Sequence, residues 1–178
     1  NLDGRLRHYS AFADINLGGI IEFALTNGVN RKTGRKVATE TGDPTTFETY
    51  EDFENAVKEQ LKYSVRICVK ESHIIDDICM DRIVPALSLS FRECVKNAKD
   101  YAWGGAKYNT GNGIILIGVA DLINSMEAIR DLVYDRKLVS MEDMVKALDA
   151  DFEGYEEIQK LCKESHKYGN DDDDVNDI

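Results

Sequence analysis

The chain has 178 residues, which is the size of one domain or of a slice of a larger one, and its 43% hydrophobic and 31% charged residues are typical of a globular protein. The net charge of -11 argues against binding to nucleic acid or to an anionic membrane surface. The longest apolar run, Ile114–Ala120, is far shorter than the roughly 18 residues of a membrane span, and no secretory signal is recognisable.

The first predicted element follows a polar stretch, residues 1–14, that we expect to be irregular. A helix is predicted from Asn16 or Leu17 to Thr26, with Gly28 as its stop. Its apolar side is formed by Ile20, Ile21, Ala24 and Leu25. Residues 28–44 then predict a long loop, a kind of segment that is usually functional or ordered by a partner surface.

The next stretch predicts three helices. Thr49 can cap the first, with Asp52 three residues later, and apolar residues then recur at steps of three and four. That helix should bury the face formed by Phe53, Ala56, Val57, Leu61, Val65 and Cys68. A separate helix is predicted through Ile74–Ile83, interrupted by Pro85, and another through Leu87–Ala98.

After residue 102 the helical spacing of apolar residues gives way to a glycine-rich turn and a strand pattern. Trp103–Asn109 forms a glycine-rich turn, and Ile114–Ile117 is the one continuous β-branched run, which predicts a strand buried on both faces. A helix through Leu122–Val133, a helix capped by Ser140 and a helix near Glu156–Glu164 follow. Because one strand cannot form a sheet, the chain is either a helical domain with an odd apolar loop or part of a larger α/β structure.

The four cysteines offer no metal or disulfide framework. Cys68, Cys79, Cys94 and Cys162 contain no CxxC pair, and we expect reduced, buried thiols in a cytoplasmic protein.

Other motifs carry little chemistry by themselves. Gly111-x-Gly113 with Gly118 has the wrong spacing for a dinucleotide fingerprint and predicts a turn with positive φ. The run Asp171–Asp174 with Asp177 lacks the Gly and Glu of a calcium loop and predicts a solvated segment.

Histidine positions do not suggest a metal site either. His8, His73 and His166 are far apart, and His73 with Cys68 or Cys79 matches no usual zinc spacing. We expect His73 to begin a helix and His166 to be exposed. No acid–base couple, GxSxG motif or Cys–His pair stands out, so the residues alone predict no autonomous active site.

Five segments together resemble one family, the glycyl radical enzymes of the pyruvate formate-lyase-like superfamily. In chain order they are IIEFALTNG (20–28), TGDP followed by FETYEDF (41–53), WGGAKYN (103–109), GVADLINSMEAI (118–129) and KYGNDDD (167–173). The last departs from the family pattern at Asp174, where a Tyr is usual. The resemblance covers the chain from about residue 4 to 178, and the order of the segments makes it specific.

The resemblance implies an α/β fold, in which this chain is a helix-rich internal segment of a ten-stranded α/β barrel. The whole of 1–178 would be an internal part of the catalytic domain. Such enzymes store a radical on a glycine in an RVaGY loop and transfer it to a cysteine in a GCvE loop, and neither loop occurs in these 178 residues. We therefore expect no catalytic residue, cofactor or metal site in this segment.

The resemblance also suggests where substrate would bind. In members that dehydrate diols, an Asp shortly after the cysteine loop helps to eliminate water. Alignment on Asn16-Leu17 places Ala11 at that position, although Asp14 is close by. Ala11 leaves room for an arylacetate decarboxylase, whereas the GGAxYN and KYGNDD forms suit the dehydratase and decarboxylase branch in general. His8 and Ser10 are the polar candidates to orient the substrate.

The expected function is thus that of a segment of a glycyl radical lyase in anaerobic metabolism, acting by decarboxylation, dehydration or C–C/C–N cleavage. The expected partners are the remainder of the polypeptide, a second copy in a homo-oligomer, and an activating enzyme that installs the radical with S-adenosylmethionine and an iron–sulfur cluster. The alternative is a non-catalytic helical scaffold or binding module derived from that family.

Overall fold

The computed structural model describes residues 11–108, 113–170 and 175, without the side chains of residues 11 and 12. The chain divides into two compact units, each with its own packing. Unit 1 consists of Asn1–Ile15 and Val65–Ile115, and unit 2 of Asn16–Ser64 and Leu116–Ile178.

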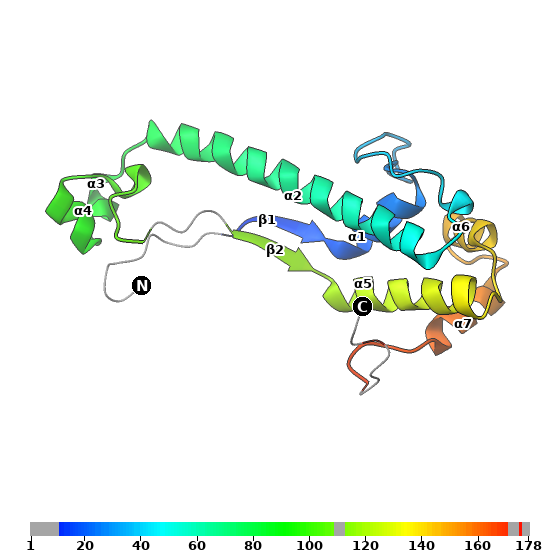
Figure 1. Cartoon of the computed structure of the whole chain (residues 1–178). Helices are drawn as coiled ribbons and strands as arrows, with labels where there is room; N and C mark the ends of the chain where they lie inside the picture. The colour runs from blue at the N-terminus through cyan, green and yellow to red at the C-terminus, as the bar shows by residue number, and fades with distance from the viewer. Residues whose placement is uncertain (1–10, 109–112, 171–174, 176–178) are drawn as a thin grey trace. The chain divides into compact units, whose positions relative to one another are not determined.

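Two strands, β1 (Ala11–Asn16) and β2 (Gly113–Ile117), pair with each other and belong mostly to unit 1. Figure 1 shows both arrows pointing the same way, so the pair is parallel. β2 confirms the predicted strand, whereas β1 shows that the prediction of an irregular stretch was wrong from residue 11 onward. The missed strand is only six residues long, too short for its alternation to stand out.

The prediction that β2 is buried on both faces was wrong for most of the strand. Ile115, Leu116 and Ile117 are 39%, 47% and 50% exposed. The physical reason is that β1 is the only strand that pairs with β2 in the described part of the chain, and a strand needs neighbours to be covered.

Each strand leads directly into a helix of unit 2. α1 (Leu17–Leu25) begins where Asn16 Oδ1 accepts the Gly19 N–H at 3.3 Å, and α5 (Val119–Ile129) begins after Gly118, whose φ is +84°. The apolar side of α1 is buried as predicted, and α1 packs against α5. Strand followed by helix, repeated with parallel strands, is the arrangement of an α/β fold.

The longest element is α2 (Tyr50–Met80), whose start was predicted correctly. Thr49 Oγ1 accepts the Asp52 N–H at 3.2 Å, and Asp52 Oδ2 accepts the Thr49 N–H at 3.0 Å. The prediction of two separate helices was wrong, because no Gly or Pro interrupts the sequence before Met80. His73 accordingly lies in mid-helix, exposed, and does not begin a helix.

Burial along α2 changes with position. Phe53 and Val57 are buried as predicted, but Leu61 and Val65 are only half-buried. Farther along, in unit 1, Ile74 and Ile78 are 59% and 54% exposed. Within the described ranges, no helix combines the length and apolar character needed to cross a membrane.

The rest of unit 1 contains two short helices, α3 (Pro85–Ser88) and α4 (Arg92–Asn97), where one helix was predicted. Their small core is formed by Phe91, Cys94 and Ala106, with Tyr101 stacked on Phe91. Tyr101 begins the 3-10 turn η2 (Tyr101–Trp103). All four cysteines are free, but only Cys94 is buried; Cys79 is exposed, so the prediction of buried thiols was wrong for that residue.

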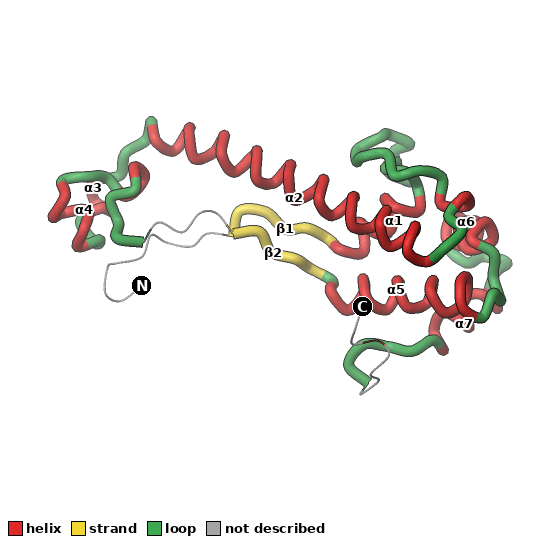
Figure 2. The backbone as a smooth tube through the Cα atoms, in the orientation of Figure 1, coloured by secondary structure: helices red, strands yellow, loops and turns green. Residues whose placement is uncertain are grey.

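The rest of unit 2 consists of helices joined by loops, as Figure 2 shows. It contains the 3-10 turn η1 (Pro44–Thr46), the π-helical segment η3 (Arg130–Asp135) that continues α5, α6 (Met141–Asp149) and α7 (Glu156–Glu164). Ser140 caps α6 by accepting the Asp143 N–H at 3.0 Å, and α7 has the predicted bounds. Leu132, Val139 and Met144 form a buried cluster here. The helix-rich α/β fold is confirmed.

A pair of substitutions tests the decrease in side-chain burial from the start of α2 toward its end. Replacing Phe53, which is fully buried, by Ala should lower the free energy of unfolding by about 3–5 kcal/mol, because a large cavity remains. The matched change Ile74→Ala, at an exposed position, should stay within about 0.5 kcal/mol. Denaturant titration of both variants of the 178-residue chain measures this; equal losses would contradict the assigned helix face.

Candidate functional site

The residues predicted to contact substrate lie at the edge of what the structure describes. His8 and Ser10 lie outside the described residues. Ala11 begins β1, and Asp14 lies within β1 with an exposed side chain. The next residue, Ile15, is buried, as expected where side chains alternate between the two faces of a strand. Asp14 is therefore the one described acidic side chain of this stretch, and it lies on the accessible face.

The first two family segments meet in unit 2 around a buried amide. Gln60 of α2 is 0% exposed, and its Nε2 donates to Thr39 O at 2.8 Å and to Thr41 Oγ1 at 3.1 Å. It also approaches Phe23 O of α1 at 3.4 Å. A single side chain thus joins α1, the loop after it and α2.

Asn27 fixes the same loop from its other side. Asn27 Oδ1 accepts the N–H groups of Thr41 and Gly42 at 2.8 and 3.0 Å. Next to it, Gly28 has a φ of +80°, and a Cβ atom at that position would lie 2.4 Å from Thr39 O. Asn27 and Gly28, at the end of the IIEFALTNG segment, therefore hold the loop backbone where the TGDP segment begins.

Asp43, the acidic residue of the TGDP segment, is also a capping residue. Its Oδ1 accepts the N–H and the hydroxyl of Thr45, at 2.9 and 2.7 Å. These hydrogen bonds favour the carboxylate and lower the pKa of Asp43. It begins η1 just ahead of Pro44.

The glycine-rich segment WGGAKYN has a similar structural role in unit 1. A Cβ atom on Gly105 would lie 2.1 Å from Lys99 O, so the backbone there admits only glycine. Trp103 Nε1 donates to Met80 O at 2.8 Å, which connects the turn to the end of α2. Asn109, the last residue of the segment, lies outside the described residues.

A buried ionisable cluster in unit 2 was not predicted. Glu127 of α5 is only 3% exposed, and its Oε2 lies 2.7 Å from Nη2 of Arg130. Tyr50 and Tyr134 form an edge-on ring pair nearby, with centroids 6.1 Å apart. The sequence signal was a Glu between Met126 and Ala128 on the apolar side of a helix; it was overlooked because acidic residues are numerous.

Burial changes the titration of both phenols in this cluster. It raises the pKa of Tyr50 to about 12, and neighbouring Glu54 acts in the same direction. The pKa of Tyr134 is likewise raised to about 12, mainly by burial and further by Asp52. Neither hydroxyl has a hydrogen-bond partner among the described residues. The cluster therefore favours the neutral form of two half-buried phenols.

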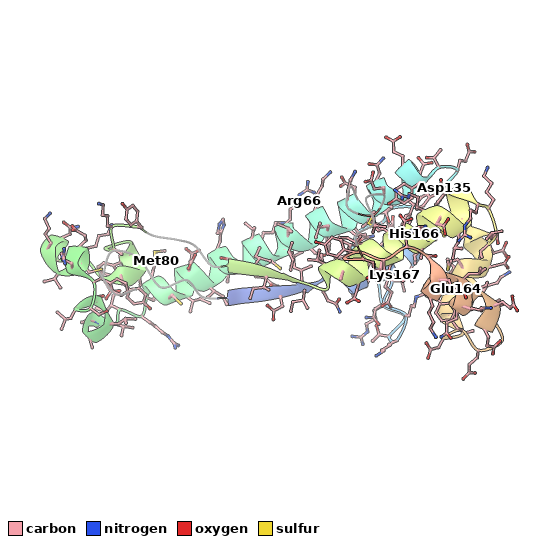
Figure 3. All side chains as sticks on the ribbon, turned by 90° about the horizontal axis from the view of Figure 1, so that it is seen from below. Arg66, Met80, Asp135, Glu164, His166 and Lys167 are labelled. Carbon is pink, nitrogen blue, oxygen red and sulfur yellow. The ribbon has the colours of Figure 1, made fainter. Side chains whose placement is uncertain are left out.

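The last family segment attaches the chain after α7 to the rest of unit 2. Lys167 Nζ donates to Cys162 O at 2.6 Å, and Tyr168 N–H donates to Asn124 Oδ1 of α5 at 2.8 Å. Figure 3 labels Lys167 and the exposed His166 in this region. The aspartates 171–174 and 177 lie outside the described residues, and no metal-binding group of three His, Cys, Asp or Glu residues occurs in the described ranges.

Comparison with known proteins identifies the family. The model of the family described as pyruvate formate lyase-like matches residues 4–178. Over 166 residues the chain is 39% identical to trans-4-hydroxy-L-proline dehydratase of Clostridioides difficile, covering 92% of this chain and 21% of that enzyme. It is 26% identical to the 4-hydroxyphenylacetate decarboxylase glycyl radical subunit of Clostridium scatologenes, over 89% of this chain and 20% of that subunit.

Solved structures agree with the sequence comparison. The substrate-bound hydroxyproline dehydratase of Clostridioides difficile superposes with a TM-score of 0.88 at 38% identity, over 92% of this chain and 21% of that one. The glycerol-bound, B12-independent glycerol dehydratase of Clostridium butyricum superposes with a TM-score of 0.91 at 28% identity, over 98% of this chain and 22% of that one. The chain belongs to the pyruvate formate-lyase-like family, as the five segments predicted, and spans about a fifth of the length of these relatives.

Two glycines with positive φ, Gly28 and Gly34, allow a matched test of the close approach between Gly28 and the loop after α1. Gly28→Ala should cost the left-handed strain of about 1–2 kcal/mol and, in addition, force Thr39 O away from the new methyl group. Gly34→Ala has the same kind of strain but no atom within 4 Å of the new methyl. Unfolding free energies and amide exchange at Thr41 and Gly42 measure this. A Gly34 variant that is as destabilised as the Gly28 variant would contradict the close approach.

The raised phenol pKa values predict loss of stability in alkali. An unfolded tyrosine titrates near 10.0, whereas Tyr50 and Tyr134 titrate at about 12 in the folded chain. Their stabilising contribution is therefore complete below about pH 10 and is lost as the pH rises toward 12. Unfolding free energies across this interval should fall less steeply in Tyr50→Phe and Tyr134→Phe than in the control Tyr108→Phe. Identical slopes in all three variants would contradict the prediction.

Proposed function

We propose that the polypeptide to which this chain belongs is a glycyl radical lyase that eliminates water or a similar leaving group from a small organic substrate. The observation that carries the proposal is the 39% identity to a dehydratase over 92% of the chain, against 26% to a decarboxylase. Decarboxylation of an arylacetate is the second candidate. It is favoured by Ala11, which leaves space where diol dehydratases have an Asp.

In this proposal the chain acts through its place in the complete polypeptide. The cysteine that forms the thiyl radical and the glycine that stores the radical belong to segments outside these 178 residues. An activating enzyme that uses S-adenosylmethionine and an iron–sulfur cluster would install the radical. The motif residues around Gln60 and Asn27 would hold α1, the following loop and α2 in the arrangement that the barrel requires.

The residues of this chain closest to the chemistry would be those before and within β1. A thiyl sulfur must reach a hydrogen of the substrate at contact distance, so residues a few positions farther along the same loop can touch that substrate. His8 and Ser10 would orient it by hydrogen bonds. Asp14, whose side chain is accessible, would provide the carboxyl group that exchanges a proton with the departing hydroxyl.

The test uses the complete polypeptide, activated with its radical-installing enzyme, on hydroxylated substrates and on arylacetates. Asp14→Asn should lower kcat on the hydroxylated substrate by about 10²–10⁴-fold, as expected for loss of a proton-transfer group. His8→Ala should raise KM more than it lowers kcat, and Ala11→Asp should abolish any arylacetate turnover. The matched control Glu48→Gln removes an exposed carboxylate from outside this stretch.

Two outcomes would contradict the proposal. Unchanged kinetics for the His8, Ala11 and Asp14 variants on every accepted substrate would remove this stretch from the substrate site. The 178-residue chain, treated in parallel with the activating enzyme and S-adenosylmethionine, should give neither turnover nor an electron spin resonance signal of a glycyl radical. Such a signal from the chain alone would show that it does not depend on the missing loops.

A further inference from the structure

Unit 2 contains a cavity of about 710 Å³ that no part of the proposed function uses. It is bounded by α1, the start of the loop after α1, α5, α6 and α7, and among the described residues none before Gly18 lines it. Cavities of about 300–1,000 Å³ are the size that small organic ligands occupy in proteins. The volume is therefore large enough for a ligand with a chain or a ring.

Much of the cavity lining is apolar. The apolar side chains that line it include Ile21, Leu25, Ala128, Ile129, Met144 and Phe152. They come from α1, α5, α6 and the turn after α6, and most of them are buried. Such a lining favours the hydrocarbon part of a ligand over water.

The rim of the cavity is cationic, although the chain as a whole has a net charge of -11. Arg31, Lys32, Lys163 and Lys167 line it, against two acidic residues, Glu22 and Asp151.

The partners of these cations leave a small excess of positive charge. Arg31 is paired with Asp149, but Lys163 Nζ donates to Gln159 Oε1 at 3.0 Å and Lys167 Nζ to Cys162 O at 2.6 Å. An amide and a backbone carbonyl satisfy hydrogen bonds without neutralising an ammonium group, so the three lysines outnumber the two carboxylates of the lining and favour an anion.

The wall between the apolar part and the rim is strained. Asp151 and Phe152 both have positive φ, at +50° and +61°, a conformation that is unfavourable for residues other than glycine. Hydrogen bonds from Phe152 N–H to Ala147 O, at 2.7 Å, and from Asp151 N–H to Leu148 O hold this turn. Strain of this kind is concentrated at ligand-binding sites, where the surrounding structure maintains it.

We propose that this cavity binds a small organic carboxylate with an apolar body, of the medium-chain or aryl type. The hydrocarbon part lies on the surface formed by α1, α5 and Phe152, and the carboxylate lies at the rim with Lys163, Lys167 and Lys32. An inorganic anion would leave the apolar lining unused, and a cation would meet the wrong sign of charge.

The experiment is a calorimetric titration of the complete polypeptide with phenylbutyrate and octanoate, with phenylbutanol as the uncharged probe. Both carboxylates should bind, and phenylbutanol should bind at least about tenfold more weakly. Lys163→Gln should weaken carboxylate binding about two- to fivefold, and Lys163→Glu about tenfold or more, since it adds a like charge. Lys160→Gln, on the same helix but outside the cavity lining, should have no effect.

The possible results decide between alternatives. No binding of either carboxylate, equal binding of phenylbutanol, or equal effects of the Lys160 and Lys163 variants would each overturn the proposal. Binding by the 178-residue chain but not by the complete polypeptide would overturn it too, because other segments would then cover the cavity. The readout is affinity and not turnover, so the result is independent of the proposed lyase activity.

Discussion

The Gln60 side chain is the interaction on which the arrangement of unit 2 depends. It is fully buried, and its amide group donates to Thr39 O and to Thr41 Oγ1 while it approaches Phe23 O. Leaving a buried acceptor unsatisfied costs about 1–3 kcal/mol, so this contact fixes a long loop that has little secondary structure of its own. Asn27 and Gly28 complete the assembly from the other side.

Most of the helices could be predicted because the residues that start and end a helix lie next to it in the sequence. Caps such as Thr49 with Asp52, and Ser140 with Asp143, determine where helices begin, and Gly28 follows the end of α1. The continuity of α2 was missed because His73 was expected to begin a separate helix, although no Gly or Pro breaks the sequence there. β1 was missed because six residues are too few for a periodic pattern.

Burial was harder to predict, because it depends on what lies outside the segment. Ile115 and Ile117 of β2 and Ile74 of α2 have the composition of a core but are exposed in the described structure. The chain spans about a fifth of the length of its relatives, and in the complete enzyme that we propose, other segments would cover these side chains. The same dependence explains why no catalytic residue could be predicted here, whereas the family could be.

The family segments therefore carry two kinds of information. Asn27, Gly28, Gly105 and Asp43 have structural roles that the geometry explains, so their presence reports the fold and not the reaction. The buried Glu127, paired with the half-buried Arg130, shows that an ionisable cluster can be hidden on the apolar side of a helix. By our proposals, the chemistry specific to this chain is concentrated in the stretch leading into β1 and in the cationic cavity.

Our central proposal is that this chain works as an internal part of a larger glycyl radical enzyme. The most direct measurement is the intact mass of the natural gene product, isolated without oxygen and identified by peptides from this segment. We expect a mass several-fold larger than the 20.0 kDa of the 178 residues. A natural product of about 20.0 kDa would contradict the account and favour a free-standing helical module.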